Sequence, residues 1–82
     1  MVIVKFGPIF EKRFKKLKNQ LLIARLKKQI AKIITNPKIG KLMRYFRKGT
    51  REIYLNPYRI SYLYIEKDKT IIILDFYHKD EQ

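Results

Sequence analysis

The sequence predicts one α+β domain over residues 1–82: a short N-terminal strand, then a two-helix hairpin packed on a three- to four-stranded, mainly antiparallel sheet. Three observations lead to this prediction. The 82 residues suffice for one small hydrophobic core and no more. Apolar residues, 46 % of the chain, recur at helical spacing in the first half and in strand-like runs in the second. Proline, glycine and asparagine separate these segments.

The N-terminal segment predicts a short strand followed by a basic helix. Residues 2–6 alternate enough for a strand, and Gly7-Pro8 ends it. Proline is favoured in the first turn of a helix, so a helix is expected to begin there. Its apolar positions fall at helical spacing among lysines and arginines: Ile9, Phe10, Phe14 and Leu17.

A second helix is predicted between two asparagines. Asn19 is a suitable N-cap, and Asn36-Pro37 ends the helix because proline cannot continue the hydrogen-bond ladder. The apolar stripe is made by Leu22, Leu26, Ile30 and Ile33, widened by Ile23 and Ile34. Residues 37–41 are expected to form a loop.

Three strands are predicted in the last third of the chain. Residues 51–55, 58–66 and 70–77 are rich in β-branched and aromatic side chains. Asn56-Pro57 makes the first connection tight, and Lys67-Asp68-Lys69 forms the second, polar turn. Short turns between successive strands indicate an antiparallel meander.

Alternation along these strands predicts which side chains share a face. The more polar set is expected to face away from the helices: Glu52, Tyr54, Arg59, Ser61, Asp75, Tyr77 and Lys79. The same alternation groups Ile72, Leu74, Phe76 and His78, so His78 points toward the core. A twist in the strand, or its end before His78, leaves the orientation of His78 open.

Positive charge is concentrated in the first part of the chain. The net charge is +13, and 16 of the 20 lysines and arginines lie in residues 1–51 with Glu11 as the single acid. Such a surface attracts polyanions: nucleic acid first, an acidic protein second and an anionic membrane third. A well-solvated surface is the alternative interpretation.

Several classes of function are disfavoured. No apolar run approaches the roughly 20 residues of a membrane span, and the first residues lack signal-peptide features, so we expect a cytoplasmic protein without a membrane partner. One histidine and no cysteine exclude the common zinc arrangements, and we expect no metal. The isolated glycines form no phosphate-binding loop, and no cofactor is expected.

The order of four motifs resembles a known family. A basic helical hairpin precedes Asn36-Pro37 with Gly40-Lys41, then residues 58–62 (Tyr-Arg-Ile-Ser-Tyr), then residues 77–79 (Tyr-His-Lys). This pattern resembles the RelE/ParE superfamily of toxins from toxin–antitoxin pairs. The resemblance implies either of two activities: RelE-like members cut messenger RNA in the ribosomal A site, and ParE-like members poison DNA gyrase. It also implies an acidic antitoxin as partner, with ribosome-bound message, or alternatively DNA gyrase, as target.

Metal-free RNA cleavage needs a group to deprotonate the 2′-hydroxyl, a group to stabilise charge on the phosphate and a group to protonate the leaving 5′-oxygen. Arg59 matches the strand arginine of the family, and its planar fork can bind two phosphate oxygens. His78 resembles the C-terminal histidine of YoeB-like members, and Lys79 stands where RelE-like enzymes carry a second arginine. Each has a structural alternative: a salt bridge of Arg59 to Glu52 or Asp75, a histidine packed at a strand end, a solvated lysine.

The chain departs from the RelE-like pattern. Glu52 and Tyr54 stand where the best-studied enzymes have two lysines, and the family's tyrosine beyond the C-terminal motif is missing. Glu52 is therefore our candidate general base, and Tyr54 and Tyr77 are candidates to stack on a base or donate a proton. The basic residues predicted to hold the RNA backbone are Arg44, Arg47, Lys48 and Arg51.

Two main hypotheses result. Arg59 and the Tyr-His-Lys end favour a ribosome-dependent mRNA endonuclease that cleaves by 2′-hydroxyl attack. The missing lysines favour a non-catalytic gyrase inhibitor, or a decayed toxin that only binds its antitoxin. A general nucleic-acid binder without a toxin role is a weaker third interpretation.

Overall fold

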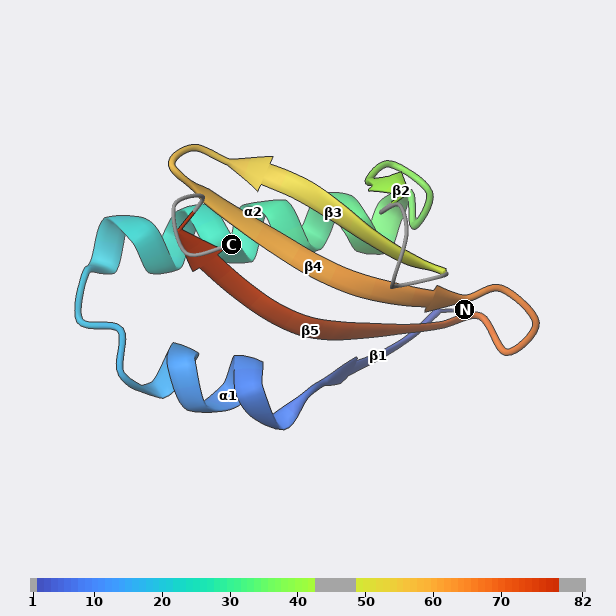
Figure 1. Ribbon diagram of the computed structural model, residues 1–82, viewed down its shortest axis with the longest axis horizontal. Helices are drawn as coiled ribbons and strands as arrows, with labels where there is room; N and C mark the ends of the chain where they lie inside the picture. The colour runs from blue at the N-terminus through green and yellow to red at the C-terminus, as the bar shows by residue number, and fades with distance from the viewer. Residues whose placement is uncertain (1, 43–48, 79–82) are drawn as a thin grey trace.

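The computed structural model describes residues 2–42 and 49–78. Two helices accompany a five-stranded sheet with the strand order β1-β5-β4-β3-β2 (Figure 1). The elements are β1 (Ile3–Phe6), α1 (Pro8–Lys15), α2 (Gln20–Thr35), β2 (Lys41–Leu42), β3 (Thr50–Leu55), β4 (Tyr58–Ile65) and β5 (Thr70–His78). All neighbouring strands are antiparallel except β1, which pairs parallel with β5. The predicted α+β class and the antiparallel meander are confirmed.

The sheet contains one strand more than the three to four predicted. The additional strand is β2, in which Lys41 pairs with Glu52 and Leu42 pairs with Arg51. Lys41 was predicted to lie in a loop, and this prediction is wrong. A strand of two residues shows no alternation of apolar and polar positions, so the sequence pattern could not predict β2. Its pairing depends on the position of β3 in the fold.

Local signals set the ends of both helices. Pro8 is the first residue of α1, and the Asn19 side chain caps α2 by accepting a hydrogen bond from the Leu22 N–H at 3.1 Å. Asn36 follows the last residue of α2, before Pro37. Helix α1 ends at Lys15, before the last apolar residue of the predicted helical pattern, Leu17. No helix among the described residues has the length and apolar content needed to cross a membrane.

The core lies between the helices and one face of the sheet. Figure 1 shows α2 crossing behind β3 and β4, while α1 runs alongside β5. The buried apolar side chains come from both helices and from the three central strands: Phe10, Leu22, Leu26, Ile30, Ile33, Leu55, Ile60, Tyr62, Ile71, Ile73 and Phe76. The opposite face of β3, β4 and β5 carries neither helix, and the candidate site lies there.

A β-bulge interrupts β5. Ser61 pairs with Asp75, but the next residue of β4, Tyr62, pairs with Ile73, which leaves Leu74 as an extra residue. One extra residue reverses the alternation, so Ile73 and Phe76 both reach the core. The prediction of one uninterrupted alternation along this strand was therefore wrong for the residues before the bulge.

A buried tyrosine fastens the connection between α2 and β2 to the sheet. The Tyr62 hydroxyl donates to Pro37 O at 2.7 Å and accepts from Gly40 N at 2.9 Å. Burial raises the pKa of the Tyr62 phenol above its ordinary value, against the smaller opposing effects of the Gly40 hydrogen bond and the Arg51 charge. A Cβ at Gly40 would lie 2.6 Å from the Tyr62 oxygen, so this approach requires glycine. Arg51 Nη1 adds hydrogen bonds to Gly40 O at 2.8 Å and Lys38 O at 3.2 Å.

Candidate nucleic-acid interface

Polar residues from β3, β4 and β5 form two rows on the helix-free face of the sheet. Cross-strand neighbours share a face, so the register identifies the members of each row. The rows are Tyr54–Arg59–Tyr77 and Glu52–Ser61–Asp75. Three neighbouring strands thus bring four predicted site residues together: Glu52, Tyr54, Arg59 and Tyr77.

Arg59 is held by two neighbours on β3. Its Nη1 lies 3.6 Å from Glu52 Oε1, and its Cζ lies 4.9 Å from the centroid of the Tyr54 ring. The first contact is the salt bridge that we considered as the structural alternative; the second is a cation–π contact. The Arg59 side chain keeps 27 % of its surface exposed. At 3.6 Å the ion pair is loose, so a phosphate group can replace the carboxylate as partner of the guanidinium.

Glu52 is positioned through both carboxylate oxygens. Oε1 faces Arg59, and Oε2 accepts a hydrogen bond from the Tyr77 hydroxyl at 3.1 Å. Only 11 % of the Glu52 side chain is exposed. A carboxylate positioned beside a guanidinium is an arrangement that general-base catalysis can use.

A second arginine reaches the same face from α1. Arg13 Nε lies 3.1 Å from Asp75 Oδ1, so Arg13, and not Arg59, is the partner of Asp75 in this ion pair. Strand β1 pairs with β5 only as far as Ile73, which leaves space for α1 beside Asp75. Between the two carboxylates, Ser61 is completely buried, and its hydroxyl has no hydrogen-bond partner among the described residues. Sequence reasoning missed Arg13, whose only signal was a basic position on an amphipathic helix.

His78 lies next to Arg59 along the sheet but on the other face. It pairs with Tyr58, so the end of β5 lies beside the beginning of β4. The His78 ring contacts the Tyr58 ring edge to face at 5.5 Å, and the Tyr58 ring contacts Phe76 at 6.2 Å. The orientation of His78, which the sequence left open, is therefore toward the core side of the sheet. Phe76 and His78 both follow the bulge and are two residues apart, so they lie on the same face.

We expect His78→Ala to lower the free energy of unfolding by about 1 kcal/mol, since it removes a ring contact on the helix side, and to spare the RNA cleavage that the RelE-like resemblance implies. Urea denaturation and single-turnover cleavage on programmed ribosomes measure the two effects. His78→Phe is the matched control, because it keeps an aromatic ring against Tyr58. Cleavage slowed about 100-fold at unchanged stability would instead assign a proton transfer to His78.

The remaining predicted residues lie elsewhere. Arg51 is on the helix-side face, opposite Tyr62, and its guanidinium binds the carbonyls of residues 38 and 40. Arg51 alternates along β3 with Ile53 and Leu55, which pack in or against the core, so strand alternation indicates the helix-side face for Arg51. Four predicted site residues fall outside the described residues, and their roles stay predictions: Arg44, Arg47, Lys48 and Lys79. Within residues 2–42 and 49–78, no three potential metal ligands cluster.

A small hollow adjoins Arg59 at the turn between β3 and β4. It has a volume of about 250 Å³ and is lined by Tyr54, Asn56, Pro57, Tyr58 and Arg59. Arg25 of α2 donates from Nη2 to Asn56 O at 3.0 Å and so ties the turn to the helix. The hollow and the ion pair of Arg59 are therefore parts of one continuous surface.

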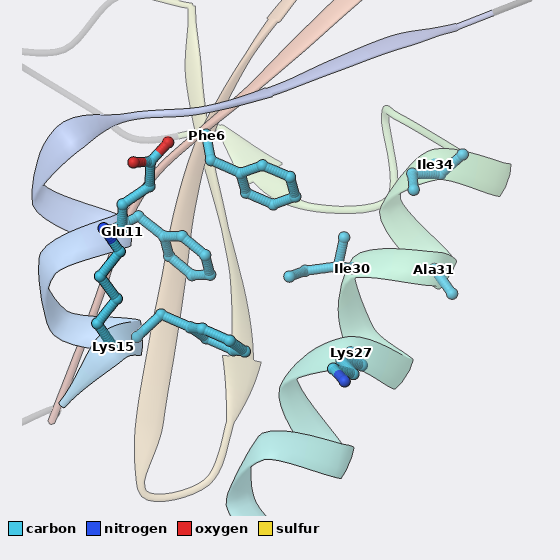
Figure 2. Close-up of a pocket in the computed structure, with 9 residues that line it drawn as sticks. Phe6, Glu11, Lys15, Lys27, Ile30, Ala31 and Ile34 are labelled. Carbon is cyan, nitrogen blue, oxygen red and sulfur yellow. The ribbon is translucent and has the colours of Figure 1, made fainter. Parts of the chain in front are cut away.

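A larger, almost entirely apolar groove separates α1 from α2 (Figure 2). Its volume is about 450 Å³. Phe6, Phe10 and Phe14 line one wall, with successive ring centroids 5.5 and 5.6 Å apart. The other wall and the rims are formed by Ile30, Ala31, Ile34, Glu11, Lys15 and Lys27. Phe6 and Ile34 remain 44 % and 40 % exposed, so Phe6 of β1 and one member of the predicted α2 stripe face this groove and are not covered by the core.

Solved toxin structures share this fold. The isolated Escherichia coli RelE toxin superposes with a TM-score of 0.81 at 21 % identity, covering 95 % of this chain and 84 % of that chain. The toxin–antitoxin complex RelBE2 from Mycobacterium tuberculosis gives 0.80 at 24 % identity, covering 95 % and 98 %. The intact E. coli RelBE complex gives 0.78 at 19 % identity, covering 93 % and 94 %. At these identities the likeness concerns the fold.

The sequence itself matches a toxin family over nearly its whole length. Residues 4–82 match the family described as the ParE toxin of the type II toxin–antitoxin system parDE. No curated protein matches the chain. The chain therefore belongs to the ParE toxin family within the RelE/ParE superfamily, and it is the toxin of a toxin–antitoxin system.

Proposed function

We propose that this toxin is an endonuclease that cleaves ribosome-bound messenger RNA by attack of a 2′-hydroxyl on the adjacent phosphate. The observation that carries the proposal is the juxtaposition of Arg59 Nη1 and Glu52 Oε1, 3.6 Å apart on the sheet face that neither α1 nor α2 covers. A phosphate-binding cation and a fixed carboxylate are two of the three groups that the reaction needs.

Each residue of the cluster has a role in this proposal. Glu52 takes the proton of the 2′-hydroxyl, whose oxygen then bonds to phosphorus as the bond to the 5′-oxygen breaks. Arg59 exchanges Glu52 for the phosphate oxygens and stabilises their growing charge. Tyr77, whose hydroxyl donates to Glu52, is our candidate donor of the proton that the leaving 5′-oxygen receives. Lys79 keeps its predicted role as a second positive charge at the phosphate.

A ParE-like, non-catalytic inhibitor of DNA gyrase is the second candidate. Three observations favour it: the family match is to ParE, His78 is on the helix side, and Glu52 and Tyr54 replace the strand lysines of RelE-like enzymes. In that case the contact between Arg59 and Glu52 is only a structural ion pair.

Primer extension on ribosomes programmed with a defined message tests the proposal. We expect a cut within the message and a product ending in a 2′,3′-cyclic phosphate, because the attacking nucleophile is the neighbouring 2′-hydroxyl. Intact message together with inhibited supercoiling by gyrase would reject the endonuclease and support the ParE-like function.

The groove between α1 and α2 is our candidate for the antitoxin-binding surface. Its lining is apolar, and its rim carries two lysines, Lys15 and Lys27, against one acid, Glu11, in a part of the chain that holds most of the positive charge. We infer that an acidic antitoxin segment inserts apolar side chains into the groove and folds as it binds. Association is expected to be faster at low salt. A cognate pair that forms no complex in 0.1 M salt would contradict this inference.

Ile34→Glu is expected to weaken antitoxin binding at least about tenfold, because it replaces an apolar contact and repels an acidic partner. Calorimetric titration of the antitoxin measures the change. Leu21→Glu is the matched control: it introduces the same charge on α2 at a position that is 71 % exposed and not part of the groove lining. Equal losses for both variants would mean that charge alone, and not the groove, determines binding.

A further inference from the structure

We propose that the hollow at the turn between β3 and β4 binds one unpaired nucleobase of single-stranded RNA, with adenine preferred. This inference rests on the proposed function, which brings RNA to the helix-free face. It adds a binding site and a base preference that the reaction itself does not require.

The size of the hollow fits a single base. Its volume of about 250 Å³ lies below the roughly 300–1,000 Å³ of pockets for drug-sized ligands, so one or two fused rings fill it. It lies at an exposed strand end where a flexible nucleic-acid strand has access. Its lining includes the aromatic and apolar residues Tyr54, Pro57 and Tyr58 and the polar residues Asn56 and Arg59.

The Tyr54 side chain offers a stacking surface. Tyr54 is 55 % exposed, and the Arg59 guanidinium lies 4.9 Å from its ring centroid. Unpaired RNA bases are commonly held by aromatic rings and by guanidinium planes. A base entering the hollow meets both kinds of surface, supplied by neighbouring residues in one cross-strand pair.

Asn56 provides the group that reads the edge of the base. Its backbone carbonyl is fixed by Arg25 at 3.0 Å, so the turn is tied to α2. Its side-chain amide forms no hydrogen bond within residues 2–42 and 49–78, and it offers two N–H donors and one acceptor oxygen. An asparagine amide can pair with N6 and N7 of adenine through two hydrogen bonds, and this pairing underlies the expected preference.

Arg59 links this site to the chemistry, because it lines the hollow and also faces Glu52. A base held in the hollow therefore belongs to a nucleotide adjoining the phosphate that Arg59 binds. The hollow would thereby determine which phosphodiester is presented to the cluster.

Binding of short uncleavable RNA tests the site. We suggest fluorescence anisotropy with 2′-O-methyl RNA pentamers of uridine in which the central base is A, G, C or U. Tyr54→Leu should weaken all four about 5- to 150-fold, the range found when a stacking ring is removed. Tyr54→Phe should retain binding, because it keeps the ring. Asn56→Ala should abolish the preference for adenine and leave the other three affinities unchanged.

The outcomes separate this site from the endonuclease. The pentamers cannot be cleaved, so their binding reports the base site even if the protein does not cut RNA. Conversely, a protein that cuts RNA can still lack the base site. Wild-type affinity in Tyr54→Leu, or equal losses in Tyr54→Leu and Tyr54→Phe, would overturn the proposal. Failure of the wild type to bind any pentamer, or tighter binding of the corresponding DNA pentamers, would also overturn it. Circular dichroism verifies that each variant is folded.

Discussion

Replacing Arg59 with alanine is expected to slow single-turnover cleavage of ribosome-bound message by about 10²–10³. The guanidinium is the one cation that lies against Glu52 in the described cluster, and it can bind two phosphate oxygens with its planar fork. Alanine removes this stabilisation of the transition state. Stability should change little, because a partly exposed, loose ion pair contributes about 0–1 kcal/mol.

Arg59→Lys separates charge from geometry. It keeps the positive charge but loses the fork, so we expect a rate between those of the wild type and Arg59→Ala. Lys28→Ala, at an exposed position of α2, is the control for the loss of one positive charge. If Arg59→Ala cleaves as fast as the wild type, Arg59 has no part in the mechanism.

Much of the fold could be predicted because its boundaries have local causes. Proline at position 8, the Asn19 cap and Asn36-Pro37 act through the backbone of their own neighbours, and all three lie where predicted. Strand β2 and the bulge at Leu74 have no such local signal. Strand β2 pairs with residues about ten positions further along the chain, and the bulge is defined by the register between β4 and β5.

Those residues of the candidate site that lie on strands with uninterrupted alternation could be placed on one face from the sequence. Glu52 and Tyr54 alternate along β3 and Arg59 lies opposite Tyr54, so their common face follows from strand geometry. Tyr77 was assigned correctly because it follows the bulge. Arg13 could not be predicted, since its contact with Asp75 depends on how α1 lies beside β5. The hollow at residues 54–59 likewise depends on the shape of the turn, which the sequence pattern does not specify.

The second large effect is expected at Glu52. Glu52→Gln keeps the size of the side chain and an oxygen for the Tyr77 hydroxyl, but it removes the group that accepts the proton of the 2′-hydroxyl. If Glu52 is the general base, cleavage should fall about 10²-fold or more. If Glu52 is only the counter-ion of Arg59, the substitution frees the guanidinium for phosphate, and cleavage should stay the same or become faster.

Asp75→Asn is the matched control for this experiment. Asp75 lies in the same cross-strand row as Glu52 and also pairs with an arginine, so its substitution removes one negative charge from the same face. Single-turnover rates of both variants, with thermal unfolding of each, separate three cases. A loss confined to Glu52→Gln supports the base; equal losses indicate a general electrostatic effect of the face and contradict it. Full activity in Glu52→Gln would leave Arg59 as the main contributor and transfer proton abstraction to another group.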